Sequence, residues 1–190
     1  MFRKIAAIFI IINLLTSLNA QDLQLYPVKT GMISYKYEGR TSGNEIIYFD
    51  SYGELFFRLK TVLSNKNAVN DSSITILKHD TLYQIDMGKK TVIINPDTNN
   101  FYSDKHNIIS SEVLSALDFV NSGIENIAGK SCNKFSGENG TLWVWNSIVL
   151  KSETEIMNTN IIKEATEISI GIDIPASRFE VPDNYKIITK

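Results

Sequence analysis

The sequence predicts an α+β fold that is mostly antiparallel β-sheet, with about ten short strands and one clear helix. Three observations lead to this class. Apolar and polar residues alternate along most of the chain, as they do in strands that bury one face. The connections between these segments are too short for the crossovers that join parallel strands. One segment has the spacing of a helix instead, so the fold is not all β.

The first segment of the chain, residues 1–20, is predicted to be a secretory signal peptide. Arg3 and Lys4 give it a positive start, Ile5 to Leu18 is a nearly unbroken apolar run, and Ala20 supplies a small residue at the cleavage point. The run is shorter than the ~20 residues that a membrane-spanning helix needs. We therefore expect an exported, periplasmic protein, with secretion or peripheral attachment to the outer membrane as alternatives.

Residues 21–190 form one predicted domain, which is long enough for a sizeable core. Removing the signal peptide takes the formal net charge from −2 to −4, which offers no basic excess for nucleic acid or an anionic membrane. Partners bound through phosphate groups are therefore disfavoured. Cys132 is the only cysteine, so no intramolecular disulfide can form, and we expect it to be a small buried core residue.

The first half of the domain is predicted to be a meander of six strands. In the first of them, Ile33, Tyr35 and Tyr37 share one face, which is typical of a half-buried strand. Turn residues separate the strands, and the polar stretch Ser64–Ser73 is expected to be a mobile loop. The predicted strands are Met32–Glu38, Glu45–Asp50, Glu54–Thr61, Ile74–Lys78, Thr81–Met87 and Thr91–Asn95.

One segment near the middle of the chain has helical periodicity. Ser110 and Ser111 offer a hydroxyl cap, Glu112 gives an acidic first turn, and apolar residues recur at helical spacing over Val113–Val120. Gly123 lies just past the end. The apolar stripe of this helix is too wide to face water, so we expect the helix to lie across a sheet.

Strands resume after the helix. Asn139 and Gly140 stand between two strand patterns and are a strong hairpin signal, and Asn146 and Ser147 form a second tight turn. Two prolines then confine the C-terminal residues to an irregular or edge path. The predicted strands are Lys130–Ser136, Thr141–Trp145, Ile148–Ile156, Glu167–Ile174 and Tyr185–Ile188.

Two of the predicted strands are apolar on both faces. In one of them Leu142 and Val144 lie on one face, and Trp143 and Trp145 lie on the other. The second is Glu45–Asp50. Two explanations remain open: either the helix and loops cover the second face, or a concave sheet and a helical lid enclose an apolar ligand.

Residues that could perform catalysis or hold a metal are few. His79 and His106 are the only histidines, and both stand in loop-like contexts. The sequence contains no metal-binding, phosphate-binding or nucleophile motif, and no pair of carboxylates placed to raise a pKa. We therefore expect no enzymatic activity, no metal and no cofactor.

Three motifs in the last third of the chain resemble those of a known family. They are Leu142–Trp145 with the turn and the Ile148–Glu153 strand that follow, Gly129–Phe135, and Phe179–Tyr185. The first resembles the hairpin of the lipoprotein-carrier-like (LolA/LolB-like) superfamily, and the others resemble related secreted domains of unknown function. The resemblance implies a curved, incomplete antiparallel barrel, or half-barrel, with a helix packed across its concave side. It also implies an apolar cavity that holds lipid or acyl chains.

On this basis we predict a periplasmic, non-enzymatic binding protein for a lipid, an acyl chain or a lipoprotein. The residues predicted to line the cavity are Trp143, Trp145, Tyr35, Tyr37 and Tyr48, with Leu114 and Leu117 on the helical lid. The alternative is a structural or interaction module of the envelope, with a filled core and an exposed patch or sheet edge for a transient protein partner. We expect a monomer that does not bind nucleic acid.

Overall fold

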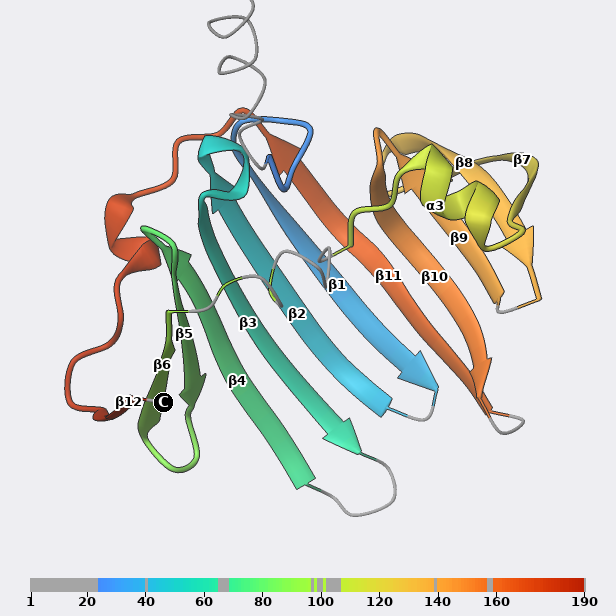
Figure 1. The fold of residues 1–190 in the computed structure, drawn as a ribbon. Coiled ribbons are helices and arrows are strands. Elements are labelled where there is room, and N and C mark those ends of the chain that lie inside the picture. The colour runs from blue at the N-terminus through green and yellow to red at the C-terminus, as the bar shows by residue number, and fades with distance from the viewer. Residues whose placement is uncertain are drawn as a thin grey trace, which may run out of the picture.

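The structure is a computed structural model, and it describes residues 24–39, 41–64, 69–96, 98, 101, 107–138, 140–156 and 159–189. These residues form one sheet of 12 strands in the order β12-β6-β5-β4-β3-β2-β1-β11-β10-β9-β8-β7 (Figure 1). The strands of the first half are β1 (Gly31–Gly39), β2 (Thr41–Asp50), β3 (Leu55–Ser64), β4 (Val69–Lys78), β5 (Thr81–Asp86) and β6 (Thr91–Asn95). Those of the second half are β7 (Val120–Ile127), β8 (Lys130–Gly137), β9 (Gly140–Trp145), β10 (Ile148–Ile156), β11 (Thr159–Ile170) and β12 (Lys186–Thr189).

Neighbouring strands of this sheet pair antiparallel, except that β12 runs parallel to β6. The described sheet is not closed, because β12 and β7 lie at its two edges (Figure 1). The fold is therefore an open, curved and mostly antiparallel sheet. This confirms the predicted strand type and the edge path of the C-terminal strand.

The tight turns join the strands as the sequence predicts. A two-residue hairpin turn of the favoured type needs a positive φ at both turn residues. Asn146 and Ser147 meet this requirement, with φ of 46° and 64°. Gly137 pairs with Gly140, so the hairpin predicted at the Asn-Gly pair is present, although Asn139 itself lies outside the described residues.

One face of the sheet, which we call the first face, carries Ile33, Tyr35 and Tyr37 of β1 and the residues in register with them. At one end of this face the segment before β1 packs over the sheet, and the Tyr26 ring stacks on Phe49 with centroids 3.8 Å apart. Burying these side chains provides a large hydrophobic stabilisation. This part of the core contains Leu25, Tyr26, Ile33, Ile47, Phe49, Phe56, Leu77, Leu82 and Phe101.

The opposite face, which we call the second face, is covered over β2 to β6 by the C-terminal segment. The 3-10 helix η2 (Ala176–Phe179) places Phe179 in a second core, where it is almost completely buried. The buried residues around it are Phe57, Ile74, Ile76, Ile85 and Val92. Both faces of β2 are thus covered there, with Phe49 in the first core and Tyr48 against the second, which explains why this strand is apolar on both sides.

The predicted helix is shorter than expected. The helix α3 spans Ser111–Ala116, and Val120, predicted to be its last apolar residue, begins β7 instead. Asp118 has a φ of 55°, and the Phe119 N–H donates to the Leu114 carbonyl oxygen at 3.0 Å. These features close the helix, because a residue in the left-handed region turns the chain away from the helical path.

Contacts on both sides of α3 place it at the β8 to β10 end of the sheet (Figure 1). Before the helix, the Ile109 N–H donates to the Ser147 carbonyl oxygen at 2.9 Å. After it, the Phe119 ring lies against Gly137 of β8. The core at the other end of the first face is covered by Leu25 and Tyr26 and not by this helix.

Two other predicted boundaries are wrong. Most of the predicted loop Ser64–Ser73 is strand, because β3 continues to Ser64 and β4 begins at Val69. Polar side chains are tolerated there because the ladder is held by its backbone, and the Ser72 hydroxyl also donates to the Thr61 hydroxyl at 3.4 Å. The strand predicted at Glu167–Ile174 begins earlier and ends at Ile170.

The described residues contain no helix that is long and apolar enough to cross a membrane. The signal peptide predicted at residues 1–20 lies outside them, as does His106. Cys132 is buried, as predicted.

Candidate functional site

Away from its apolar core, the first face carries charged side chains as well as apolar ones. In register with Tyr35 and Tyr37 of β1 stand two charged residues, Glu45 of β2 and Lys163 of β11. Only 3% of the surface of Glu45 is exposed, and the Lys163 side chain is also largely buried. A buried charge is costly unless it is paired and hydrogen-bonded, so this pair is the most distinctive feature of the face.

The Glu45 carboxylate is held by donors from β1 and from β11, the strand beyond it. It accepts from the Lys163 ammonium and, at 2.9 Å, from the Tyr37 hydroxyl. Burial raises the pKa of the Glu45 carboxyl, but the Lys163 charge and these hydrogen bonds outweigh burial and hold the pKa below its ordinary value. Glu45 is therefore ionised at neutral pH.

Lys163 connects three parts of the molecule. Besides Glu45, its ammonium donates to the Asn107 side-chain oxygen at 2.8 Å, and it lies 4.2 Å from the centroid of the Tyr35 ring. Burial lowers the pKa of Lys163 to about 8, although Glu45 acts to raise it. The ammonium thus ties the segment that leads into α3 to the centre of the first face.

Two more cations follow on the next strand of the same face. Arg58 and Lys60 of β3 stand opposite Ile47 and Glu45 of β2. The Arg58 guanidinium donates to the Thr75 hydroxyl at 3.2 Å. Beside it is a hollow of about 240 Å³ whose first-face lining consists of Arg58, Ser73, Thr75, Gln84, Asp86 and Ile93.

The far end of the first face, near the hairpin turns, carries apolar side chains that are only half-buried. By register they share the face of Lys163 and Tyr37. These residues are Tyr37, Val62, Leu142, Phe135 and Ile161. The first face therefore has a closed apolar end, a charged middle and a partly open apolar end.

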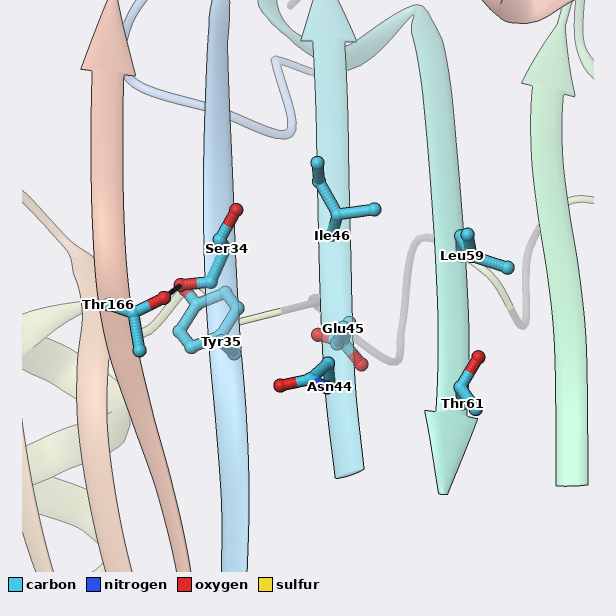
Figure 2. Close-up of a pocket in the computed structure, with 8 residues that line it drawn as sticks. All are labelled: Ser34, Tyr35, Asn44, Glu45, Ile46, Leu59, Thr61 and Thr166. Atoms are coloured by element: carbon cyan, nitrogen blue, oxygen red, sulfur yellow. Dashed lines mark hydrogen bonds between the residues drawn. The ribbon is translucent and has the colours of Figure 1, made fainter. Parts of the chain in front are cut away.

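A second hollow, of about 260 Å³, lies on the second face across β11, β1, β2 and β3 (Figure 2). Ile46 and Leu59 form its apolar part, and the Thr166 hydroxyl donates to the Ser34 carbonyl oxygen at 3.3 Å beside them. The rest of its second-face lining consists of short polar side chains, Asn44 and Thr61 among them. It is a weaker candidate than the first face because it lacks an arrangement that would select a ligand.

The seven residues predicted to line a cavity are distributed over both faces of the sheet and the region of α3. Tyr35 and Tyr37 lie together on the first face beneath Lys163, and the Tyr35 hydroxyl donates to the Val149 carbonyl oxygen at 3.0 Å. Tyr48 lies on the second face, 4.6 Å below the Arg178 guanidinium. On α3, Leu114 is buried, and just after it Leu117 is 49% exposed.

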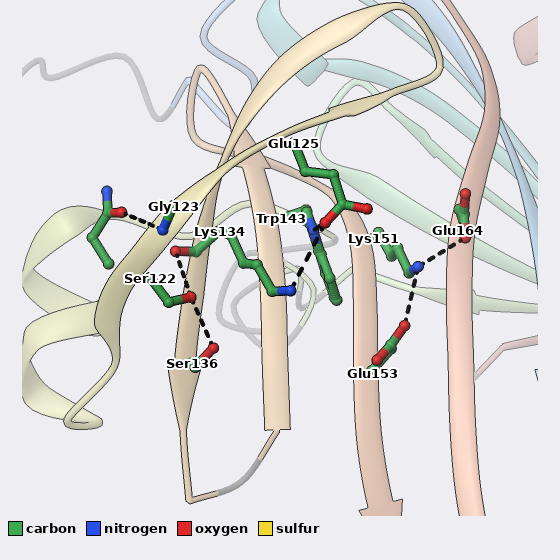
Figure 3. A network of polar contacts seen from close by, with 10 residues as sticks. Ser122, Gly123, Glu125, Lys134, Ser136, Trp143, Lys151, Glu153 and Glu164 are labelled. Atoms are coloured by element: carbon green, nitrogen blue, oxygen red, sulfur yellow. Dashed lines mark hydrogen bonds and ion pairs between the residues drawn. The ribbon is translucent and has the colours of Figure 1, made fainter.

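Trp143 is covered by the protein's own charged side chains (Figure 3). The Lys134 and Lys151 ammonium groups lie 4.9 and 4.7 Å from its ring centroid, and its indole N–H donates to Glu125 at 2.8 Å. Trp145 has Lys130 at 4.9 Å from its ring. By register Trp143 faces the side of Lys151, which is the second face, whereas Tyr35 lies on the first face, and both are buried in the same core cluster.

Sequence reasoning missed the charged residues Glu45, Arg58, Lys60 and Lys163. A signal for three of them was present. Glu45 continues the alternation that Ile47 and Phe49 begin, and Arg58 and Lys60 continue that of Phe56, so each occupies a position expected to face inward. A charge at an inward position of a strand indicates either a buried ion pair or a site.

The described residues hold no group of three or more His, Cys, Asp or Glu side chains that could bind a metal ion. His79 lies exposed in the turn between β4 and β5. The first face carries cations, hydroxyls and apolar surface side by side.

The open, curved antiparallel sheet of this chain is similar to the folds of several solved structures. An uncharacterized conserved protein from Thermus thermophilus matches with a TM-score of 0.55 at 10% identity, over 86% of this chain and 92% of that one. A chain of the Pseudomonas aeruginosa MucA/MucB complex matches with a TM-score of 0.51 at 11% identity, over 85% of this chain and 58% of that one.

A crystal structure of MucB matches with a TM-score of 0.50 at 11% identity, over 90% of this chain and 65% of that one. This chain thus spans less than two thirds of the matched chain in both MucB structures. At such identities the likeness concerns the fold alone. No protein-family model matches the chain, and no curated protein matches its sequence.

Proposed function

We propose that this chain is a non-enzymatic binding protein of the cell envelope that holds a lipid, an acyl chain or the acyl group of a lipoprotein against the first face of its sheet. The observation that carries the proposal is the partly open apolar end of that face, formed by Tyr37, Val62, Leu142, Phe135 and Ile161. Half-buried apolar surface gathered on one face of an open sheet is where a hydrophobic ligand gains most from burial.

The energetics of acyl-chain burial and the likeness to known proteins support the same proposal. Each methylene group removed from water contributes ~0.8 kcal/mol, so an acyl chain needs no specialised side chain to be retained. The sequence motifs resemble those of lipoprotein carriers, and the fold likeness supports the corresponding architecture. In this proposal the first face is the concave side of a half-barrel, and an exported, monomeric protein carries the ligand there without a cofactor.

The test compares two neighbouring positions on β3. Val62 is half-buried on the first face, and Leu63, 45% exposed, points to the second face. Val62→Gln should weaken binding of a fluorescent fatty acid at least about threefold, because a polar group then meets the chain. Leu63→Gln should leave affinity unchanged. Equal affinity of both variants and the unmodified protein would contradict the proposed location, and absence of any acyl-probe uptake would contradict the function.

A second candidate function, binding of a protein partner, is favoured by a different observation. The edge strand β7 exposes two large aliphatic side chains, Val120 at 68% and Ile124 at 72%. An edge strand offers free backbone groups to an extended segment of another protein, which would add a strand beside β7. MucB, which is similar in fold, is seen in a complex with MucA.

Substitution at the two sheet edges separates this candidate from the first. Ile124→Lys should abolish copurification of an envelope partner, because an edge lysine opposes strand addition, whereas Ile187→Lys on the opposite edge strand should not. Equal recovery of the partner with both variants would remove the role of β7.

A further inference from the structure

We propose that the charged middle of the first face binds the anionic head group of an amphipathic ligand, a carboxylate or a phosphate, through Arg58 and Lys60. This inference rests on the proposed function and names the class of ligand that it would carry. The apolar tail would then lie along the partly open end of the same face.

The local charge balance carries the argument. Arg58, Lys60 and Lys163 share the first face with the carboxylate Glu45, and the register places Asp71 of β4 on this face as well, opposite Val62. Like charges placed together destabilise each other, and Lys60 and Arg58 both contribute to the lowered pKa of Lys163. An anion in this place would relieve that repulsion.

The carboxylate that lines the hollow beside Arg58 is already engaged. Asp86 of β5 accepts from the Lys89 backbone N–H at 2.8 Å and from its ammonium at 2.9 Å. These contacts lower the pKa of Asp86 and keep it ionised, and Lys89 offsets its charge. Asp86 therefore does not cancel the cations of β3.

The hollow beside Arg58 has the donors that an anion requires. Its first-face lining includes the hydroxyls of Ser73 and Thr75, the amide of Gln84 and the Asp86 carboxylate, and Lys60 stands next to it, opposite Ser73. The Thr75 hydroxyl accepts from Arg58 and keeps its own hydrogen to donate. At about 240 Å³ the hollow is below the range of pockets that enclose a whole ligand, which suits a head group.

The apolar end lies next to the cations on the same strand. Val62 follows Lys60 by two residues on β3, so its side chain points to the same face about 7 Å away. Tyr37 of β1 lies across β2 from Val62, and the Lys60 ammonium is 5.0 Å from the centroid of its ring. A ligand whose head group lies at Lys60 and whose tail lies along Val62 would therefore meet a charged side chain first and apolar side chains next.

The net charge of −2 for the whole chain does not oppose this. A partly buried cluster acts through a low local dielectric, and more distant surface charges are screened. The relevant quantity is the charge within hydrogen-bond reach of the hollow.

The experiment uses three probes on the mature protein: oleate, its neutral glycerol ester monoolein, and inorganic phosphate. Oleate should bind at least about tenfold more tightly than monoolein at low salt, because charge-assisted hydrogen bonds act only on the anion. Lys60→Gln should remove that preference, and Lys60→Arg should retain it. Lys36→Gln is the matched control, since Lys36 is an exposed lysine on the second face, paired with Glu38.

The outcomes separate this inference from the proposed function. If monoolein binds as well as oleate and Lys60→Gln changes neither affinity, the anion site is refuted while lipid binding stands. If phosphate binds in a Lys60-dependent way and neither lipid binds, the anion site stands for a free anion and the proposed function fails. If no probe binds, both fail.

Discussion

Removing the charge of Glu45 should strongly destabilise the fold. Glu45→Gln keeps the size of the side chain but leaves the buried Lys163 ammonium without its carboxylate, near Arg58 and Lys60. Breaking one partner of a buried ion pair typically costs about 3–5 kcal/mol. Since Lys163 retains its bond to Asn107 and is partly exposed, we expect the lower limit, about 3 kcal/mol.

Urea unfolding followed by circular dichroism measures this directly. For a domain of this size about 3 kcal/mol corresponds to a midpoint lowered by roughly 1–1.5 M, and to a melting temperature lowered by roughly 6–12 °C. Glu38→Gln is the control, because Glu38 is an exposed carboxylate paired with Lys36, and it should leave the midpoint unchanged.

A double-mutant cycle identifies the origin of the loss. Glu45→Leu with Lys163→Met removes both charges, so the pair of substitutions should destabilise less than Glu45→Leu alone. Additive effects of the two substitutions, or a loss below about 1 kcal/mol for Glu45→Gln, would refute the conclusion that this ion pair is buried and coupled.

Three further predictions concern the stability of the fold. Tyr26→Ala should cost about 3 kcal/mol or more in urea unfolding, because the ring is buried and stacked on Phe49. Gly53→Ala should cost more than about 1 kcal/mol, since Gly53 has a φ of 101° and a β-carbon there would lie 2.7 Å from Leu25 Cβ; an unchanged midpoint would refute this. Because the pKa of Glu45 is lowered in the folded state, the unfolded chain takes up the proton first on acidification. The free energy of unfolding should therefore fall below pH 4.5, and this fall should be smaller in Glu45→Gln.

The parts of the fold that were predicted from the sequence are those set by local residues. The turn at Asn146 and Ser147 was predicted because few residues adopt a positive φ at both positions. The alternation of Ile33, Tyr35 and Tyr37 gave the buried face of β1. Neither pattern depends on what the strand pairs with.

The strands that were missed lack such a local pattern. β7 is exposed from Val120 to Asn126, so no alternation marks it, and the apolar residues before it favoured a longer helix. In β11 the register shifts opposite Ser34 and Tyr35. The alternation of apolar and polar residues along β11 is therefore interrupted at Thr166 and Glu167. The pairing of β1 with β11 joins distant segments and could not be derived from either alone.

The candidate site follows from that distant pairing. Glu45 resembles the polar start of a strand until β11 is placed on the other side of β1, where Lys163 meets it. The predicted aromatic residues were identified from their place in apolar strand patterns, and the structure distributes them over the two faces of the sheet. Of these, Tyr35 and Tyr37 lie beneath Lys163 on the first face.

Stability alone gives no reason for these charges. Replacing a buried ion pair by well-packed apolar residues is often neutral or stabilising, so a face made only of aliphatic side chains would fold at least as well. The charges stand at the boundary between the closed core under Tyr26 and the partly open apolar end at Val62. A protein that binds an amphipathic ligand needs polar groups at this boundary, because the head group must find partners where its tail enters apolar surface. The proposed binding of an amphipathic ligand would therefore give a reason for the position of Glu45, Arg58, Lys60 and Lys163 that folding stability does not give.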